Sequence, residues 1–255
     1  MDVPAELRAL FAGWEKPMIL ACLQGRMGSV HTDGGTPPRS ALCTIGDFCF
    51  LAGRPDPALV RQARRPILVP CSRDWEPLIR AVWRDQTAPF QRYALREAPS
   101  GFDRARLSGL ADSLPAGFSL SPIRPGHLPA LLSQDWSRDL CGNFTGELDF
   151  ARDGLGFLAL YQGVPAAGAA SYAVCSTGIE IEVDTRPDMR RRGLASACAA
   201  RLILECLDRG LYPGWDAHNL RSAALAQKLG YQPEGAYTAY WLSVSSGGPG
   251  DAMEQ

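Results

Sequence analysis

The segment RPDMRRRGLASA, at residues 186–197, places three consecutive arginines before a glycine and a run of small residues. Backbone N–H groups at the start of a helix have no partners within that helix, and together with the helix dipole they favour an anion. Gly193 and Ala195 leave room for a diphosphate to approach the backbone, and neighbouring arginines can pair with phosphate oxygens. The segment therefore predicts an anion site, provided that a helix begins at Leu194.

The residues on either side of this segment predict the elements that would position it. Residues 178–185, GIEIEVDT, alternate strictly between apolar and acidic side chains, which is typical of a half-buried strand. From Leu194 onward, apolar residues recur at every fourth position, which predicts an amphipathic helix that ends at Gly210. The order is therefore strand, basic loop and helix.

Different ligands for the basic loop have less support in the sequence. The chain has no GxxxxGK[ST] motif, and no GxGxxG follows a predicted strand, so nucleoside triphosphate and dinucleotide sites are disfavoured. Nucleic-acid binding through residues 190–192 is the weakest alternative, because the net charge of −1 gives no general attraction to polyanions.

A second strand and helix follow the first pair. Residues 212–217 read as a strand, and Asn219 is a good N-cap for a helix that ends at Gly230. Residues 236–242, AYTAYWL, then predict a last, aromatic strand.

From about Phe118 to Leu242, this pattern resembles the GNAT-type N-acetyltransferases. The superfamily motif, Gln/Arg-x-x-Gly-x-Gly/Ala, is met by Arg190, Gly193 and Ala195. The Trp-Asp-Ala-x-Asn stretch, followed by Ser-x-x-Leu-Ala-x-Lys-Leu-Gly-Tyr, more narrowly resembles the bacterial subgroup that includes zwittermicin A N-acetyltransferase. That subgroup also has a preceding N-terminal region.

The resemblance implies a fold and an activity. The fold would be a mixed, mostly antiparallel sheet flanked by helices and preceded by a smaller α/β domain. The activity would be direct transfer of an acetyl group from acetyl-CoA, as co-substrate, to the amine of a small molecule within a ternary complex. A non-catalytic acyl-CoA-binding or interaction module is the alternative.

The resemblance also assigns residues to the cofactor. Backbone amides across the loop and helix start would hold the CoA pyrophosphate, the strand edge would pair with the pantetheine amides, and the second helix start would border the pantetheine arm. For Asn219, a plain N-cap is the alternative. The full set is Val183, Asp184, Thr185, Arg190, Arg191, Arg192, Gly193, Leu194, Ala195, Ser196, Asn219 and Ser222.

Acetyl transfer requires a neutral amine, so a base must remove a proton from the acceptor. Glu180 and Glu182 are the candidates, because their strand approaches the thioester in this fold, and Glu182 is favoured as the nearer to the loop. An ordinary solvated strand face is the alternative. Ala226 stands where many superfamily members have a tyrosine that protonates the leaving thiolate, so the general acid is unassigned.

Residues 131–144, LLSQDWSRDLCGNF, fall in the region that shapes the acceptor pocket in this fold. Trp136 and Asp139 are candidates for contact with an amine, by stacking and by charge. The alternative is an aromatic anchor and a solvated acid.

The composition indicates a globular protein of two domains. The chain has 255 residues, of which 46% are hydrophobic and 21% charged. Pro and Gly near 114–117 suggest a boundary. The expected division is an α/β domain of unknown role at 1–115, the GNAT domain at 116–245 and a disordered tail at 246–255.

Several further classes are disfavoured. No stretch approaches the roughly 18 apolar residues of a membrane span, and the N-terminus lacks the features of a signal peptide. The eight cysteines form no CxxC pair and the three histidines give few metal ligands, so no metal is expected. We expect a cytoplasmic protein with a small-molecule partner and neither nucleic acid nor membrane; a homodimer is left open.

Overall fold

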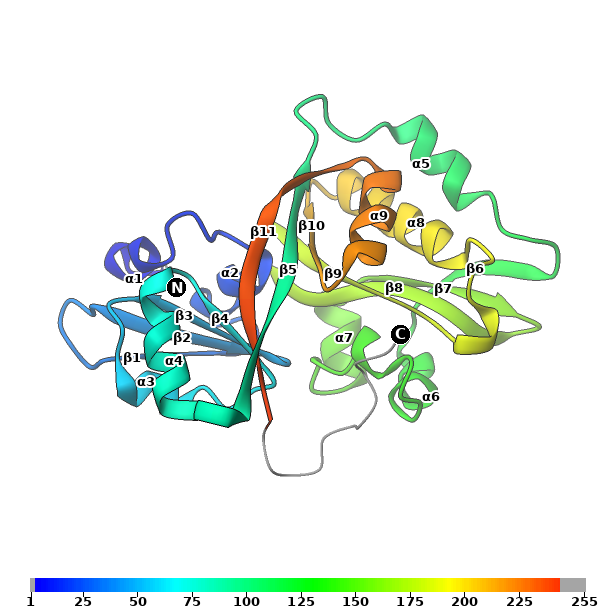
Figure 1. The fold of residues 1–255 in the computed structure, drawn as a ribbon. Coiled ribbons are helices and arrows are strands. Elements are labelled where there is room, and N and C mark those ends of the chain that lie inside the picture. Colours follow the sequence, from blue (N-terminus) through cyan, green and yellow to red (C-terminus); the bar gives the residue numbers. More distant parts are fainter. Residues whose placement is uncertain (1–2, 244–255) are drawn as a thin grey trace. The chain divides into compact units, whose positions relative to one another are not determined.

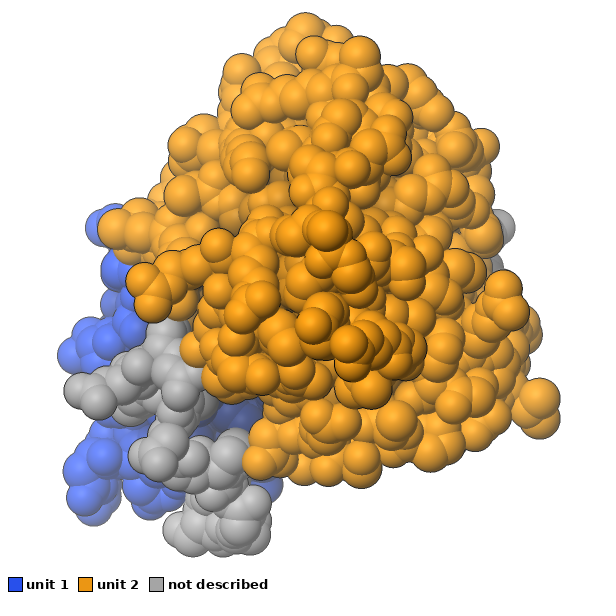
Figure 2. All heavy atoms as spheres, turned by 90° about the vertical axis from the view of Figure 1, so that its right-hand side faces the viewer, with its two compact units in different colours: residues 1–15, 28–91, 238–255 blue, residues 16–27, 92–237 orange. Residues whose placement is uncertain are grey.

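The computed structural model describes residues 3–243, which separate into two compact units (Figures 1 and 2). Of the described residues, unit 1 contains 3–15, 28–91 and 238–243, and unit 2 contains 16–27 and 92–237. Both units draw on separate parts of the chain, whereas the sequence suggested two consecutive domains. The expected boundary at residue 115 stays a prediction, and the expected tail at 246–255 lies outside the described residues.

Unit 1 is built around a small mixed sheet. β2 and β3 form a hairpin, in which Gly46 has a φ of 50°, as a two-residue turn requires. β3 pairs with β4 in parallel, and β4 pairs with the end of β11 antiparallel. The elements are α1 (Ala5–Leu10), β1 (Ser29–Thr32), β2 (Ser40–Ile45), β3 (Phe48–Gly53), α3 (Pro57–Gln62), β4 (Ile67–Pro70), α4 (Glu76–Trp83) and parts of β5 (Thr87–Glu97) and β11 (Tyr231–Leu242).

Unit 2 contains the strands on which the candidate site depends. Their order is β5-β10-β9-β8-β7-β6, and every neighbouring pair is antiparallel except β9 and β10, which are parallel. The predicted mixed, mostly antiparallel sheet is therefore confirmed. The strands that lie wholly in this unit are β6 (Phe118–Pro122), β7 (Gly156–Tyr161), β8 (Val164–Cys175), β9 (Gly178–Thr185) and β10 (Tyr212–Ala217).

Helices cover both faces of the unit 2 sheet, with α8 and α9 on one face and α6 and α7 on the other (Figure 1).

The sequence did not predict α5, because RARLSGLA has too few apolar residues to form a clear stripe. In the structure Asp103 caps α5 and Leu107 is buried. No helix within residues 3–243 is long and apolar enough to cross a membrane. The helices are α2 (Pro17–Leu23), α5 (Arg104–Ala111), α6 (Leu128–Leu132), α7 (Glu147–Asp153), α8 (Leu194–Asp208) and α9 (Leu220–Leu229).

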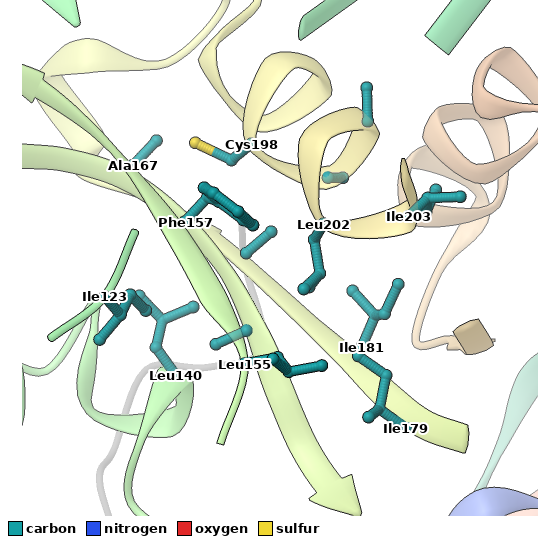
Figure 3. Close-up of a cluster of buried hydrophobic side chains, with 14 of the residues drawn as sticks. Ile123, Leu140, Leu155, Phe157, Ala167, Ile179, Ile181, Cys198, Leu202 and Ile203 are labelled. Atoms are coloured by element: carbon teal, nitrogen blue, oxygen red, sulfur yellow. The ribbon is translucent and has the colours of Figure 1, made fainter. Parts of the chain in front are cut away.

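The apolar stripe of α8 forms the centre of the unit 2 core. Cys198 and Leu202 point from α8 toward the sheet, where Phe157 and Ile181 lie (Figure 3), and both α8 side chains are fully buried. The predicted four-residue spacing of this stripe is confirmed. This packing fixes the start of α8 against the end of β9 and so positions the basic loop between them.

Candidate functional site

β9 and β10 pair over only a short stretch. Their parallel register runs from Gly178 opposite Tyr212 to Glu180 opposite Gly214. From Ile181 to Thr185, β9 pairs with β8 alone among the described strands. Part of one backbone edge of β9 therefore has no neighbouring strand, and an extended ligand can hydrogen-bond to such an edge.

The start of α8 has the geometry expected of an anion site. Gly193 precedes the helix with a φ of 82°, a left-handed conformation that favours glycine. A Cβ added to Gly193 would meet no atom of residues 3–243 within 4 Å, so the space above its backbone is open in the described part of the chain. Among the described residues no side chain caps this end, and the first backbone bond runs from the N–H of Ala197 to the carbonyl of Gly193. Residues of this chain therefore fit a diphosphate here.

The three arginines of the loop have different roles in the structure. Arg190 Nε donates to the carbonyl of Thr185 at 3.4 Å and so ties the loop to the end of β9. Arg191 and Arg192 are exposed, and Arg191 adopts a left-handed φ of 63°. Arg190 thus supports the loop, while the other two place their backbone and charge at its surface.

Lys228 is a residue of this site that the sequence patterns did not single out. Its Nζ donates to Ser196 Oγ at 3.4 Å, which brings an ammonium group from α9 to the first turn of α8. The only signal in the sequence was the lysine of the Lys-Leu-Gly-Tyr stretch, and nothing in that stretch indicates which helix end the lysine reaches.

Asn219 is the N-cap of α9, as predicted. Its Oδ1 accepts from the backbone N–H of Ser222 at 2.9 Å, so the cap interpretation is confirmed. The cap uses only the side-chain oxygen, and the NH₂ group can still donate to a ligand. Ser222 Oγ accepts from Trp215 Nε1 at 3.1 Å and so joins α9 to β10. Cofactor contacts by Asn219 and Ser222 stay predictions.

Glu180 lies where β9 and β10 separate. Its side chain is buried, so the solvated-face interpretation is wrong for this residue. Its Oε2 lies 3.1 Å from where a Cβ at Gly214 would be, and the backbone N–H of Asp216 donates to the carboxyl. Its Oε1 is buried without a hydrogen-bond partner among residues 3–243.

The surroundings of Glu180 favour its protonated form. Burial and then the negative charge of Asp216 raise its pKa to about 8, against the opposing effect of Lys16 and Arg92. A carboxyl group with this pKa can exchange a proton with its surroundings near neutral pH.

Three further carboxyl groups gather beyond Glu180. Burial, Asp184 and Asp139 raise the pKa of Glu182 well above its ordinary value. Burial and Asp139 likewise raise the pKa of Asp184 to about 7, although Arg190 opposes the shift. The structure therefore brings Asp139, in the 3₁₀ turn at 138–140, close to the acids of β9.

Trp136, the second predicted acceptor residue, packs against the core. It is half-buried there, and its Nε1 donates to Gln134 Oε1 at 2.8 Å. This is the aromatic anchor that the sequence left open as the alternative. Stacking of Trp136 on an acceptor stays a prediction.

Asp216 is the centre of a polar network that the sequence did not reveal. Its side chain is only 2% exposed, and it forms ion pairs with Lys16 and Arg92. Tyr237 donates its hydroxyl hydrogen to Oδ2 at 2.7 Å, and Arg92 Nη2 donates to the backbone carbonyl of Asp216 at 3.2 Å. Lys16 and Arg92 come from distant parts of the sequence, so no local pattern links them.

The side chain of Ala226 has no proton to donate and cannot act as the general acid. It is fully buried within the unit 2 core. Within residues 3–243, no group of three or more His, Cys, Asp or Glu side chains is arranged to hold a metal ion.

Comparisons with known sequences agree with this geometry. The sequence profile of the family described as "GNAT acetyltransferase" matches residues 8–240. A relative from Bacillus subtilis strain 168, named "Uncharacterized N-acetyltransferase YdfB", is 27% identical over 232 residues, which cover 84% of this chain and 85% of the relative.

Solved structures show the same fold. A GCN5-related N-acetyltransferase-like protein from Streptococcus suis 89/1591 is 44% identical, with a TM-score of 0.88 and coverage of 94% of this chain and 100% of that chain. A GCN5-related N-acetyltransferase from Kribbella flavida is 18% identical, with a TM-score of 0.55 over 89% of this chain and 95% of that chain, and shows the fold alone.

Proposed function

Because the chain belongs to the GNAT acetyltransferase family, we propose that it transfers an acetyl group from acetyl-CoA to the amine of a small molecule by direct transfer in a ternary complex. Residues 191–196 hold the pyrophosphate through the backbone N–H groups at the start of α8, where Gly193 leaves open space. The edge of β9 at 183–185 has no neighbouring strand on the β10 side among the described residues; it accepts the pantetheine arm, and the Asn219 NH₂ group donates to it.

Glu180 is the base in this proposal. The observation that carries it is the buried Oε1 atom, which has no partner within the described residues and is therefore available to accept a proton. The ionised carboxylate takes a proton from the acceptor's ammonium group. The neutral amine then attacks the thioester carbonyl and a C–N bond forms. The C–S bond breaks, CoA leaves as a thiolate, and the proton that the nitrogen loses on forming the amide passes to that thiolate or to solvent.

Glu180 replaces Glu182 as the first choice because of where each side chain lies. Glu180 is buried at the point of strand separation, whereas Glu182 is half-buried among other carboxyl groups. Glu182, Asp184 and Asp139 form an acidic border that attracts a cationic amine.

A non-catalytic acyl-CoA-binding module is the second candidate, and the buried Ala226 is the observation that favours it. Without a tyrosine at this position, α9 supplies no acid for the thiolate from there. Turnover separates the two candidates, whereas CoA binding is common to both.

The test is an assay of the full chain with acetyl-CoA and a library of small amines. Release of free thiol should match the formation of an acetylated amine detected by mass spectrometry. Glu180→Gln should lose most of this activity, whereas Glu205→Gln, on the outer side of α8, should retain it. A folded protein that binds acetyl-CoA but acetylates no amine would support the binding module instead.

A further inference from the structure

The Asp216 carboxylate is held on both of its oxygens. Lys16 and the Tyr237 hydroxyl contact Oδ2, and Arg92 Nε donates to Oδ1 at 2.7 Å. Burial raises the pKa of Asp216, but the two cations more than offset this effect and hold its pKa below the ordinary value. Asp216 is therefore ionised at neutral pH, inside the protein.

Stability alone does not explain such a network. Replacing a buried ion network with apolar side chains is often neutral or stabilising, because taking charges out of water is costly. The network also contacts the proposed base, because the backbone N–H of Asp216 donates to the carboxyl of Glu180.

We propose that Asp216 is a positioning residue, whose backbone N–H holds Glu180 in the gap between β9 and β10 and whose carboxylate, fixed by Lys16 and Arg92, sets the charge that Glu180 faces. The catalytic consequence rests on the proposed function, because it requires Glu180 to be the base.

The groups that face Glu180 come from three strands and the residue before α2. The charged ones are Asp216 on β10, Arg92 on β5 and Lys16, which directly precedes α2. The phenols of Tyr212 and Tyr231 lie within electrostatic range on β10 and β11. Among them, Asp216 is the nearby negative group, so its charge can be tested separately from those of the two cations.

The signs of the two charges give opposite predictions. A like charge near a carboxyl group raises its pKa, and an opposite charge lowers it. Asp216→Asn should therefore lower the pKa of Glu180, while Lys16→Met should raise it, each by about one pH unit. A loss of structure common to both variants would instead shift the pKa of Glu180 in the same direction.

The experiment is an NMR titration of the full chain labelled with ¹³C at the glutamate carboxyl carbons, in which Glu180→Gln identifies the Glu180 signal. Tyr237→Phe keeps all charges and should move the pKa far less than Asp216→Asn. Asp208→Asn, which removes an exposed aspartate at the end of α8, is the matched control and should leave the pKa unchanged.

The titration overturns the proposal if folded Asp216→Asn and Lys16→Met shift the pKa of Glu180 in the same direction or not at all. If Asp216→Asn fails to fold, Lys16→Met decides alone, since the absence of an upward shift refutes the proposal. The NMR readout needs no substrate. Opposite shifts in a protein that acetylates no amine would support the positioning of Glu180 and reject the proposed function.

Discussion

The carboxyl of Glu180 on β9 accepts a hydrogen bond from the backbone N–H of Asp216 on β10, just beyond the last pair of the two strands. That last pair joins Glu180 to Gly214, and a Cβ at Gly214 would lie 3.1 Å from Glu180 Oε2 and 2.7 Å from Pro17 Cγ. A glycine at 214 therefore leaves the space that the Glu180 carboxyl occupies. The separation of the strands and the placement of the proposed base are thus parts of one arrangement.

The open backbone at Gly193 predicts a specific loss of cofactor binding. Gly193→Val should weaken CoA binding at least tenfold, because the branched side chain would fill the space of the pyrophosphate. The left-handed φ adds a strain of about 1–2 kcal/mol. Arg191→Ala should weaken CoA binding much less than Gly193→Val, because Arg191 contacts the pyrophosphate mainly through its backbone N–H. Calorimetric titration with CoA measures both.

Gly210 provides the matched control for strain. It lies at the other end of α8, with a φ of 67°, and no atom of the chain between residues 3 and 243 lies within 4 Å of an added Cβ. Gly210→Val should cost similar stability in thermal unfolding but leave CoA binding intact. Equal losses of affinity in the two valine variants would reject the site at Gly193.

Lys228 should contribute to the affinity for CoA through its charge at the first turn of α8. Lys228→Gln is expected to weaken CoA binding about threefold to tenfold at low salt, and less as salt screens the charge. Arg209→Gln, at the opposite end of the same helix, is the control. Titrations at two ionic strengths measure the effect, and identical affinities for wild type and Lys228→Gln at low salt would contradict it.

The proposed base predicts how the rate depends on pH. Since Glu180 must be ionised to accept a proton and burial raises its pKa to about 8, kcat/KM should fall as the pH is lowered through about 8. Glu180→Gln should lower kcat about 10²- to 10⁴-fold and remove this limb of the profile. Steady-state rates over a pH series measure it, and a limb retained in the variant would assign the base elsewhere.

The raised pKa of Glu180 also predicts how the stability of the protein depends on pH, whether or not the protein is active. Between its ordinary pKa of 4.5 and about 8, Glu180 keeps its proton in the folded chain but loses it on unfolding. The folded state binds more protons there, so the free energy of unfolding falls as pH rises across this window. Relative to Glu180→Gln, the wild-type Tm should therefore drop between about pH 5 and pH 8. A constant difference would mean that the pKa is not raised.

Position 226 should not accept a tyrosine in place of its alanine. Ala226 is fully buried, so Ala226→Tyr should destabilise the protein by about 1–3 kcal/mol through overpacking. It should also fail to raise kcat, because the core and not the site receives the ring. Thermal unfolding and steady-state rates test this, and a stable variant with higher kcat would place residue 226 beside the leaving group.

Much of the fold could be predicted from local patterns. The alternation in β9, the four-residue stripe of α8 and the Asn219 cap are short-range signals, and the structure confirms the strand, the helix and the cap. The burial along β9 does not alternate, however, because residues 178–181 are all buried and residues 182–185 are all half-buried. Local patterns did not predict α5, because its few apolar residues form no clear stripe. The partner against which α5 packs, α8, is evident only in the structure.

The surroundings of the acids on β9 were not predictable in this way. Alternation places Glu180 and Glu182 on one face, but it does not say what covers that face. Lys16 lies 200 residues from its partner Asp216, and Arg92 lies 124 residues away. These pairings depend on how β5, β10 and the residue before α2 come together.

The sequence by itself therefore determined the elements on either side of the basic loop, the loop itself and the family resemblance, because each depends on residues close together in the chain. Only the tertiary structure decided that Glu180 is buried beside an ionised Asp216, that Asp139 lies close to Glu182 and Asp184, and that Lys228 reaches the start of α8. Burial and electrostatic interaction depend on distance in space. A protonation state is therefore set by neighbours that the order of residues does not reveal.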